Sequence, residues 1–298
     1  MPDAGGTMMT APAAREIGID GRGGWAAAAA AIAILSISYG SPLLIVVGLK
    51  PITAGLGTIR ELTSLAAALT WVGTGLGGIL MGWLSDRIGI RRTVMFGAVM
   101  IAAGLAVSAI GTVWALYLGH GLLLGLLGNG AMFPPLLVYV SRWFEKRRGT
   151  ALALIASGQY IAGMVWPSVF QAAMARYGWQ ATMVGYGLVT LVAIPPVALL
   201  FLHPPPPQAH ATATPGVNPV RGQALGLPAN LVLGVLCVAG FCCCVPMALP
   251  QSHLVAFCTD VGLPAASSAL MLSLLQACAF VSRQFWGWLA DRVGGLPT

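Results

Sequence analysis

The chain has 298 residues, of which 57% are apolar and 8% are charged, with a mean hydropathy of +0.84 and a formal net charge of +7. A soluble globular domain carries about 25% charged residues, so this composition indicates that many segments meet lipid rather than water. The Lys and Arg residues are scattered and form no basic face interleaved with aromatic residues, which argues against a nucleic-acid partner.

Eight apolar runs are long enough to cross a bilayer, which takes about 20 residues. Each is expected to be a helix, because lipid offers the backbone no hydrogen-bond partners and a helix satisfies its own. In chain order they are Trp25–Gly48, Leu62–Leu84, Thr93–Ile110, Trp114–Val140, Thr150–Ala173, Trp179–Leu202, Leu231–Pro250 and Ala265–Leu289. Their many Ala and Gly residues favour close approach between helices.

This pattern predicts an all-α polytopic membrane protein with two unequal parts. We expect a cytoplasmic tail at residues 1–24 and an N-terminal six-helix bundle at 25–203. A Pro-rich cytoplasmic linker is expected at 204–230, because four consecutive prolines stop the sixth helix. Residues 231–298 are then a partial C-terminal bundle that holds spans seven and eight.

The positive charges predict the orientation of the spans. With the N-terminus in the cytoplasm, the inner segments hold eleven of the fifteen Lys and Arg residues. The outer loops hold Lys50, Arg60 and Arg176, and Arg283 falls within a span. We therefore expect a multi-pass protein of the cell inner membrane with a cytoplasmic N-terminus.

One eight-residue element occurs twice, at an offset of 205 residues. Gly82–Gly89 reads GWLSDRIG after the second span, and Gly287–Gly294 reads GWLADRVG after the eighth. Each copy therefore follows the second span of its own half, as in parallel transporter repeats. The residues of this loop signature that we expect to act in conformational switching are Gly82, Asp86, Arg87, Gly89, Arg91, Arg92, Gly287, Asp291 and Arg292.

The chemistry of the loop signature suggests how it would switch. Gly89 permits a tight turn between helices. Asp86 is expected to pair with Arg87 or Arg91, or to face the positive N-terminal end of a neighbouring helix. By the same reasoning Asp291 should face the start of span five, near Gly149–Ala151, and Asp86 should face span eleven of a twelve-span fold. The simpler alternative is a charged loop that only sets topology.

The signature G-x-L-x-D-R-x-G-x-R-R resembles that of the major facilitator transporters. Three further stretches are similar to the monocarboxylate transporters and the oxalate/formate antiporters: Ser38–Pro42 (SYGSP), Arg142–Gly149 (RWFEKRRG) and Tyr177–Gln180 (YGWQ). The resemblance implies twelve spans, so the chain is expected to be truncated after the eighth. It implies a secondary active carrier of small carboxylates that works by alternating access.

Arg283 is the leading candidate for substrate binding. The resemblance implies that an arginine at this place in span eight binds the substrate carboxylate, and the residue chemistry agrees. An arginine within a span costs roughly 2.5–3.5 kcal/mol on insertion scales, which makes it a functional candidate. All eight acidic residues fall in loops or at the ends of predicted spans, so none pairs with Arg283 inside the membrane. Its planar fork matches a carboxylate, although a side chain that reaches the inner surface is the alternative.

Two positions depart from the proton-coupled members of the resembled branch. Those transporters often carry an acid one turn before the span-eight arginine and a lysine after the proline of span one. Here the two positions hold Ala279 and Leu43. Proton symport through those residues is therefore in doubt, and anion exchange or coupling elsewhere stays open.

Other polar residues in the spans are weaker candidates for the substrate site. Tyr39 lies in the break of span one, where backbone groups could be free for a solute. The rest are Asn129, Gln159, Tyr160 and His253, for which ordinary interhelical hydrogen bonds or an interfacial position are the alternatives. The six cysteines form no C-x-x-C pair and are interpreted as apolar filler, with no metal or cofactor expected.

Other functions fit less well. A drug carrier would show a Gly-Pro-rich signature in span five, and Gly158–Pro167 (GQYIAGMVWP) does not match one well. A drug or sugar carrier of the same fold, or a non-functional truncated fragment, stays an alternative. A membrane enzyme is disfavoured because no nucleophile–base pair, metal triad or phosphate-binding loop is present. The expected partners are a small organic anion and the lipid bilayer, with the protein as a monomer.

Overall fold

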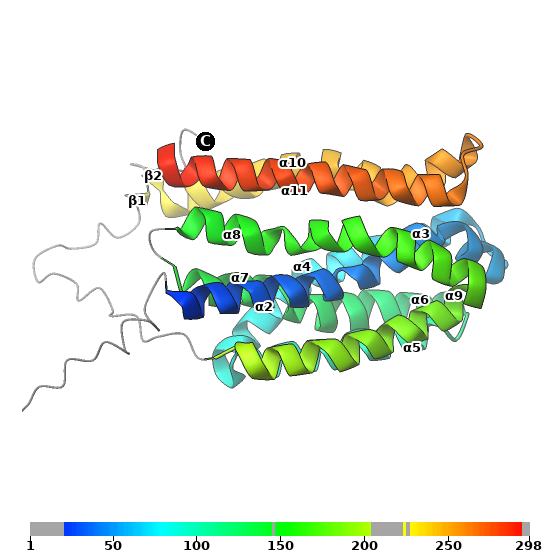
Figure 1. Ribbon diagram of the computed structural model, residues 1–298, viewed down its shortest axis with the longest axis horizontal. Helices are drawn as coiled ribbons and strands as arrows, with labels where there is room; N and C mark the ends of the chain where they lie inside the picture. Colours follow the sequence, from blue (N-terminus) through cyan, green and yellow to red (C-terminus); the bar gives the residue numbers. More distant parts are fainter. Residues whose placement is uncertain (1–20, 145–146, 204–222, 225–226, 294–298) are drawn as a thin grey trace, which may run out of the picture.

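The computed structural model describes residues 21–144, 147–203, 223–224 and 227–293. Residues 1–20 of the predicted tail, most of the predicted linker and Gly294 of the second signature lie outside the described residues, and the last residues of that tail, from Arg22, already belong to the first helix. Figure 1 shows the long helices side by side, with their axes close to parallel. This arrangement confirms the predicted all-α membrane fold.

The helices follow the predicted spans in order. The first four spans contain α2 (Arg22–Ser38), α3 (Gly40–Gly55), α4 (Arg60–Ile88), α5 (Ile90–Ser108), α6 (Val113–Tyr117), the π-helix η1 (Leu118–Gly128), the 3-10 turn η2 (Asn129–Ala131) and α7 (Phe133–Ser141). Then come α8 (Arg148–Ala156), α9 (Gly158–Phe201), α10 (Ala229–Asp260) and α11 (Ala265–Val293). Two short strands, β1 (Gln223–Ala224) and β2 (Leu227–Pro228), pair antiparallel just before α10.

Seven helical stretches among the described residues are apolar and long enough to cross a membrane. The longest, Arg148–Phe201, has 54 residues. A straight helix of that length would measure about 80 Å, far more than the roughly 30 Å of a hydrocarbon core. It reverses at Gly178, whose φ of 80° is a conformation that glycine adopts without a steric cost. Figure 1 shows α9 returning along the bundle after this point, so the stretch supplies spans five and six.

The first span is broken at Tyr39, as the sequence predicts. The break frees carbonyl groups of α2, and side chains of α9 take them. Trp166 Nε1 donates to the Ser36 carbonyl at 2.9 Å, and the Tyr186 hydroxyl donates to the Ile37 carbonyl at 2.6 Å. These two carbonyls are therefore satisfied inside the protein, and the expectation of backbone free for a solute is wrong for them.

Small residues let the helices of the first half approach closely. Gly73 and Gly77 of α4 and Gly104 of α5 pack directly on the backbone of η1. At Gly77 an added Cβ would lie 2.7 Å from the Leu126 carbonyl carbon, which is too close for any side chain. This packing confirms the prediction of close helix approach. The glycines of span four take part from the other side, since Gly119 and Gly130 meet the backbone of Gly104 and Gly77.

The second half is represented by two helices that contact the first bundle differently. Helix α11 packs along α8 and α9, whereas α10 contacts α11 and α3. Figure 1 shows α10 and α11 side by side along one flank of the bundle. The predicted end of span seven at Pro250 is wrong, because α10 continues to Asp260 with Pro246 and Pro250 inside it. A proline removes one helical hydrogen bond but does not end a helix whose later turns are intact.

Candidate functional site

Arg283 and Tyr160 form the centre of the candidate site. Arg283 lies on α11 and Tyr160 on α9, so the pair joins the two halves of the protein. Arg283 Nη1 donates to the Tyr160 hydroxyl at 3.1 Å, and its guanidinium carbon lies 5.5 Å from the Tyr160 ring centroid. Tyr160 is buried, with 5% of its surface exposed, and Arg283 is half-buried.

The charge of Arg283 is not neutralised by its surroundings. Within the described part of the chain, no carboxylate lies within ion-pair distance of its guanidinium. Its observed hydrogen-bond partner there is the neutral Tyr160 hydroxyl, which takes one of the five N–H donors. The remaining donors leave room for a bidentate carboxylate, whose two oxygens match the guanidinium fork.

Several neighbours of this pair escaped the sequence analysis. The Tyr160 hydroxyl is 3.6 Å from the Met247 sulfur of α10, and Gln284 Nε2 donates to Ser157 Oγ at 2.6 Å. Gln276 lies two turns before Arg283 on α11 and packs on Gly163 of α9. Gln276 is buried, with 4% of its surface exposed, and its Oε1 has no hydrogen-bond partner in the described structure. The signal that could have found Gln276 is its spacing of two turns from Arg283 along α11, which places the two residues on one helix face.

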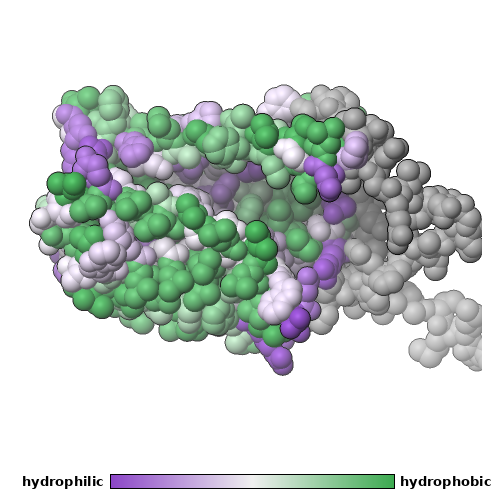
Figure 2. Space-filling view, turned by 180° about the vertical axis from the view of Figure 1, so that it is seen from behind, coloured by the Kyte–Doolittle hydropathy of each residue, from purple (hydrophilic) through white to green (hydrophobic). Residues whose placement is uncertain are grey.

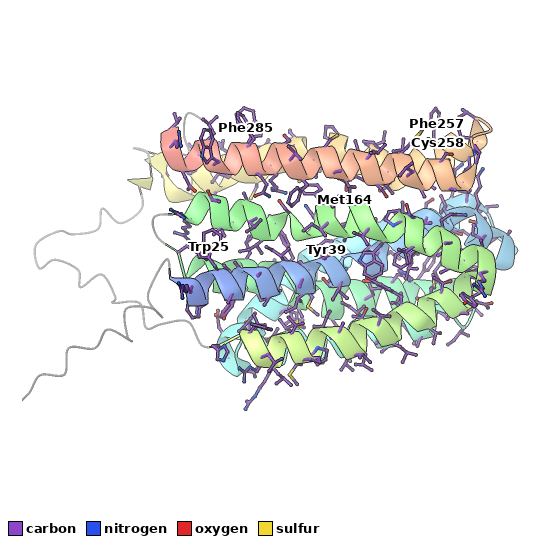
Figure 3. All side chains as sticks on the ribbon, viewed as in Figure 1. Trp25, Tyr39, Met164, Phe257, Cys258 and Phe285 are labelled. Carbon is purple, nitrogen blue, oxygen red and sulfur yellow. The ribbon has the colours of Figure 1, made fainter. Side chains whose placement is uncertain are left out.

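The other predicted substrate residues do not join Arg283. Tyr39 is buried in the first bundle, where its ring packs near Trp71 and Phe133. Figure 3 shows its position inside the bundle. Asn129 is fully buried in η2, and neither side-chain polar atom has a partner among the described residues. Gln159 is half-buried next to Tyr160, and His253 is exposed on α10. The structure therefore brings together Arg283 and Tyr160 and leaves the other four elsewhere.

The second copy of the loop signature contacts the first bundle where the sequence predicts. The Asp291 carboxylate accepts hydrogen bonds from the backbone N–H groups of Gly149, at 2.9 Å, and Thr150, at 2.8 Å. The Thr150 hydroxyl donates to the same carboxylate. Helix α8 begins at Arg148, so these are unpaired N–H groups of its first turn, where a negative charge is stabilised. Gly287 packs against Ala153 one turn further along α8.

The first copy does not form the predicted pairs between Asp86 and the arginines of its own loop. Asp86 pairs with Arg142, at 3.5 Å, and not with Arg87 or Arg91. Arg87 stacks over the Trp83 ring instead, at 3.9 Å, and Arg91 Nε donates to the Leu202 carbonyl at 3.3 Å. Helix geometry explains the stack of Arg87 on Trp83, because residues four positions apart on α4 lie on the same face of the helix. Arg292 and Trp288 of the second copy repeat this stack at 4.1 Å.

The first copy of the loop signature also includes the turn between α4 and α5 and a cavity on the protein surface. Gly89 has a φ of 86°, which confirms the predicted glycine turn between α4 and α5. Arg92 is exposed, and a cavity of about 680 Å³ adjoins Gly82, Asp86 and Arg142. A Cβ on Gly82 would meet no described atom within 4 Å, in contrast to Gly287. The equivalent surface of the first copy is therefore uncovered in the described structure.

The surface matches that of a membrane protein. Figure 2 shows a broad apolar face with hydrophilic residues gathered towards the two ends, and a hollow between the α10–α11 pair and the rest of the bundle. Five of the six cysteines are exposed, and Cys258 is buried near the α10–α11 connection, as Figure 3 shows. The described residues contain no group of three His, Cys, Asp or Glu side chains that could hold a metal ion.

Comparison with known proteins identifies relatives along nearly the whole chain. The sequence profile of the Major Facilitator Superfamily matches residues 25–298. Monocarboxylate transporter 11 of Homo sapiens is 30% identical over 284 residues, which cover 93% of this chain and 58% of that protein. Monocarboxylate transporter 3 of Rattus norvegicus is 28% identical over 278 residues, covering 91% of this chain and 56% of its own length. The MFS-type transporter pynF of Aspergillus niger is 25% identical over 237 residues, covering 77% of this chain and 53% of that protein.

The chain thus spans little more than half the length of these curated relatives. The profile match covers far more than half of the chain, and the repeated loop signature and the membrane helices agree with it. On this evidence the chain belongs to the Major Facilitator Superfamily and is a multi-pass membrane protein of a transporter family.

Proposed function

We propose that the protein is a secondary carrier of small carboxylates, and that Arg283 binds the carboxylate group. The observation that carries this proposal is the half-buried Arg283 guanidinium, whose partner in the described structure is a neutral hydroxyl. A half-buried cation with no carboxylate partner attracts a counter-ion, and a carboxylate substrate supplies one with two charge-assisted hydrogen bonds. The monocarboxylate transporters among the relatives support the same substrate class.

Tyr160 has a supporting role in this proposal. Its hydroxyl holds one Nη of Arg283 without removing the positive charge, and so fixes the direction of the guanidinium fork. The nearby Met247 gives an apolar wall from α10, which suits the short hydrocarbon body of a small organic acid. Tyr39, Asn129, Gln159 and His253 stay proposed contacts for other stages of the transport cycle.

The loop signatures are proposed to control alternating access. We place the N-terminus in the cytoplasm, and this proposed orientation puts Asp291 and Gly89 at the inner end of the bundle and Asp260 at the outer end. The bond between Asp291 and the start of α8 would then hold the inner ends of α11 and α8 together, and its release would let the halves move apart. Asp86 is expected to make the equivalent contact with span eleven of a twelve-span transporter.

Two alternatives differ from this proposal in their substrate or coupling. A carrier of neutral sugars or apolar drugs would not need the charge of Arg283. Coupling to protons is a separate question, because Ala279 and Leu43 stand where the resembled proton-coupled transporters carry an acid and a lysine. Exchange of one anion for another needs neither residue.

The experiment is uptake by the purified protein in proteoliposomes, with radiolabelled L-lactate, pyruvate, formate and oxalate, and with glucose as the neutral control. We expect saturable uptake of at least one carboxylate and none of glucose, with Arg283→Ala inactive. Uptake of glucose at the same rate, or full carboxylate uptake by Arg283→Ala, would reject the carboxylate assignment. Preloading the vesicles with unlabelled anion, in one arm, separates exchange from uptake driven by a pH gradient.

A further inference from the structure

A cluster of three charged residues joins the two halves at the end opposite Asp291. Lys50 Nζ lies 2.7 Å from one oxygen of Asp260, and Arg60 Nη1 lies 2.8 Å from the other. Lys50 belongs to α3 and Arg60 begins α4, whereas Asp260 ends α10. One carboxylate of the second half therefore bridges the first two spans of the N-terminal bundle.

The cluster carries more positive than negative charge. Two cations share the single carboxylate of Asp260, and the neighbouring Glu61 is exposed and makes no ion pair with them in the described structure. The side chains of Lys50 and Asp260 are 47% and 44% exposed. Ion pairs at this exposure are weak, because water competes for both partners. The contact between Lys50 and Asp260 is therefore a weak one that a competing group can break.

A cavity of about 190 Å³ lies beside this cluster and is lined by Lys50 itself. Helices α3, α9, α10 and α11 surround it with Lys50, Gln171, Met174, Val255, Thr259 and Ala265. One cation and two neutral polar side chains on an otherwise apolar wall match a ligand with one charged head and a short hydrocarbon body. Because the walls come from both halves, the cavity changes shape when the halves move.

We infer that this cavity is a second carboxylate-binding site, at which an incoming anion competes with Asp260 for Lys50. With Asp260 on Lys50, the ion pairs hold α10 against α3 and α4 and close this end. A small carboxylate that takes Lys50 leaves Asp260 with Arg60 and weakens the bridge between the halves. This inference rests on the proposed carboxylate transport, and on the proposed orientation that places the cluster on the outer side.

If a ligand competes with Asp260 for Lys50, substitutions of these two residues should change carboxylate affinity in opposite directions. A purely structural ion pair does not predict this difference. Loss of Lys50 removes the group that holds the ligand, whereas loss of the Asp260 charge removes the ligand's competitor. Lys50→Gln should therefore weaken carboxylate binding at this site, and Asp260→Asn should strengthen it. If the ion pair only held the helices together, both substitutions would break the same bond and shift binding in the same direction.

The test is calorimetric titration of L-lactate into the protein in lipid nanodiscs at low salt, in the Arg283→Ala background so that the inner site is removed. We expect residual binding that Lys50→Gln weakens about tenfold or more, that Lys50→Arg retains, and that Asp260→Asn strengthens several-fold. Two controls remove a charge from the same end: Arg176→Gln, whose side chain lies over Tyr177 at 5.5 Å, and Glu61→Gln. Both should leave binding unchanged.

The outcomes separate this inference from the proposed function. No residual binding in the Arg283→Ala protein, or shifts of the same sign for Lys50→Gln and Asp260→Asn, overturns the second site. An effect of Arg176→Gln equal to that of Lys50→Gln also overturns it, because net charge alone would then explain the result. Equal lactate binding by Arg283→Ala and the unmodified protein refutes the proposed role of Arg283 instead, whatever the Lys50 variants do.

Discussion

Replacing Asp291 with Asn tests the contact between the second loop signature and α8. The substitution keeps the size of the side chain and one carbonyl oxygen but removes the charge. In the structure the Asp291 carboxylate accepts hydrogen bonds from the backbone N–H groups of Gly149, at 2.9 Å, and Thr150, at 2.8 Å. It also accepts one from the Thr150 hydroxyl. The first turn of α8 should therefore lose most of its tie to α11.

The magnitude follows from the geometry. A hydrogen bond to a charged group contributes about 1.5–3 kcal/mol, and a negative charge at a helix N-terminus adds about 0.3–1 kcal/mol. Asp291 is exposed, and Asn keeps one acceptor, so a net loss of about 1–2 kcal/mol is expected after screening by water. This is about a 5–30-fold shift between the docked and released forms.

The assay is hydrogen–deuterium exchange of the peptide that contains Gly149 and Thr150. Asp291→Asn should speed exchange of these two amides about 5–30-fold, while lactate affinity at Arg283 changes less than twofold. Thr150→Val is the matched control, because it removes the hydroxyl partner and leaves both N–H bonds to the carboxylate. Unchanged protection in Asp291→Asn, or an equal effect in Thr150→Val, would refute the reasoning.

Three further substitutions test the packing. Gly287→Ala should lower the midpoint of thermal unfolding because its Cβ would run into Ala153, whereas the Cβ of Gly82→Ala meets no described atom within 4 Å and should be tolerated; equal midpoints would contradict this. Gly178→Ala should cost about 1–3 kcal/mol, since φ is 80° there, and a stability equal to that of the unmodified protein would disprove a strained turn. Ser108→Ala removes the 2.7 Å partner of the buried His120 Nδ1 and should cost about 1–3 kcal/mol in denaturant titrations. The exposed Ser141→Ala serves as its control, and the idea fails if the two are equally stable.

Features that depend on the local sequence or on the repeat could be predicted before the structure. The membrane helices follow from the length of the apolar runs, and the turn at Gly89 follows from the need for a positive φ. The contact of Asp291 with the start of α8 was predicted because an N-terminal helix end attracts a carboxylate, and the repeat places Asp291 at that end of the bundle.

Features that depend on the rotation of one helix against another could not be predicted. Asp86 pairs with Arg142, 56 positions away along the chain, and the freed carbonyl of Ser36 is taken by Trp166. Asp260 was expected in a loop beyond span seven, and only the continuation of α10 past Pro250 brings it to Lys50. Sequence separation holds no information on such partners, because packing decides which faces meet.

Binding of L-lactate to purified Arg283→Ala, Arg283→Lys and unmodified protein tests the central claim most directly. The account predicts that Arg283→Ala loses high-affinity binding by more than tenfold, since a charge-assisted pair is worth about 1.5–3 kcal/mol. Arg283→Lys should fall between the two, because an ammonium keeps the charge and loses the planar fork. Equal lactate affinity in all three proteins would contradict carboxylate recognition by Arg283 and leave a major facilitator protein of another substrate class.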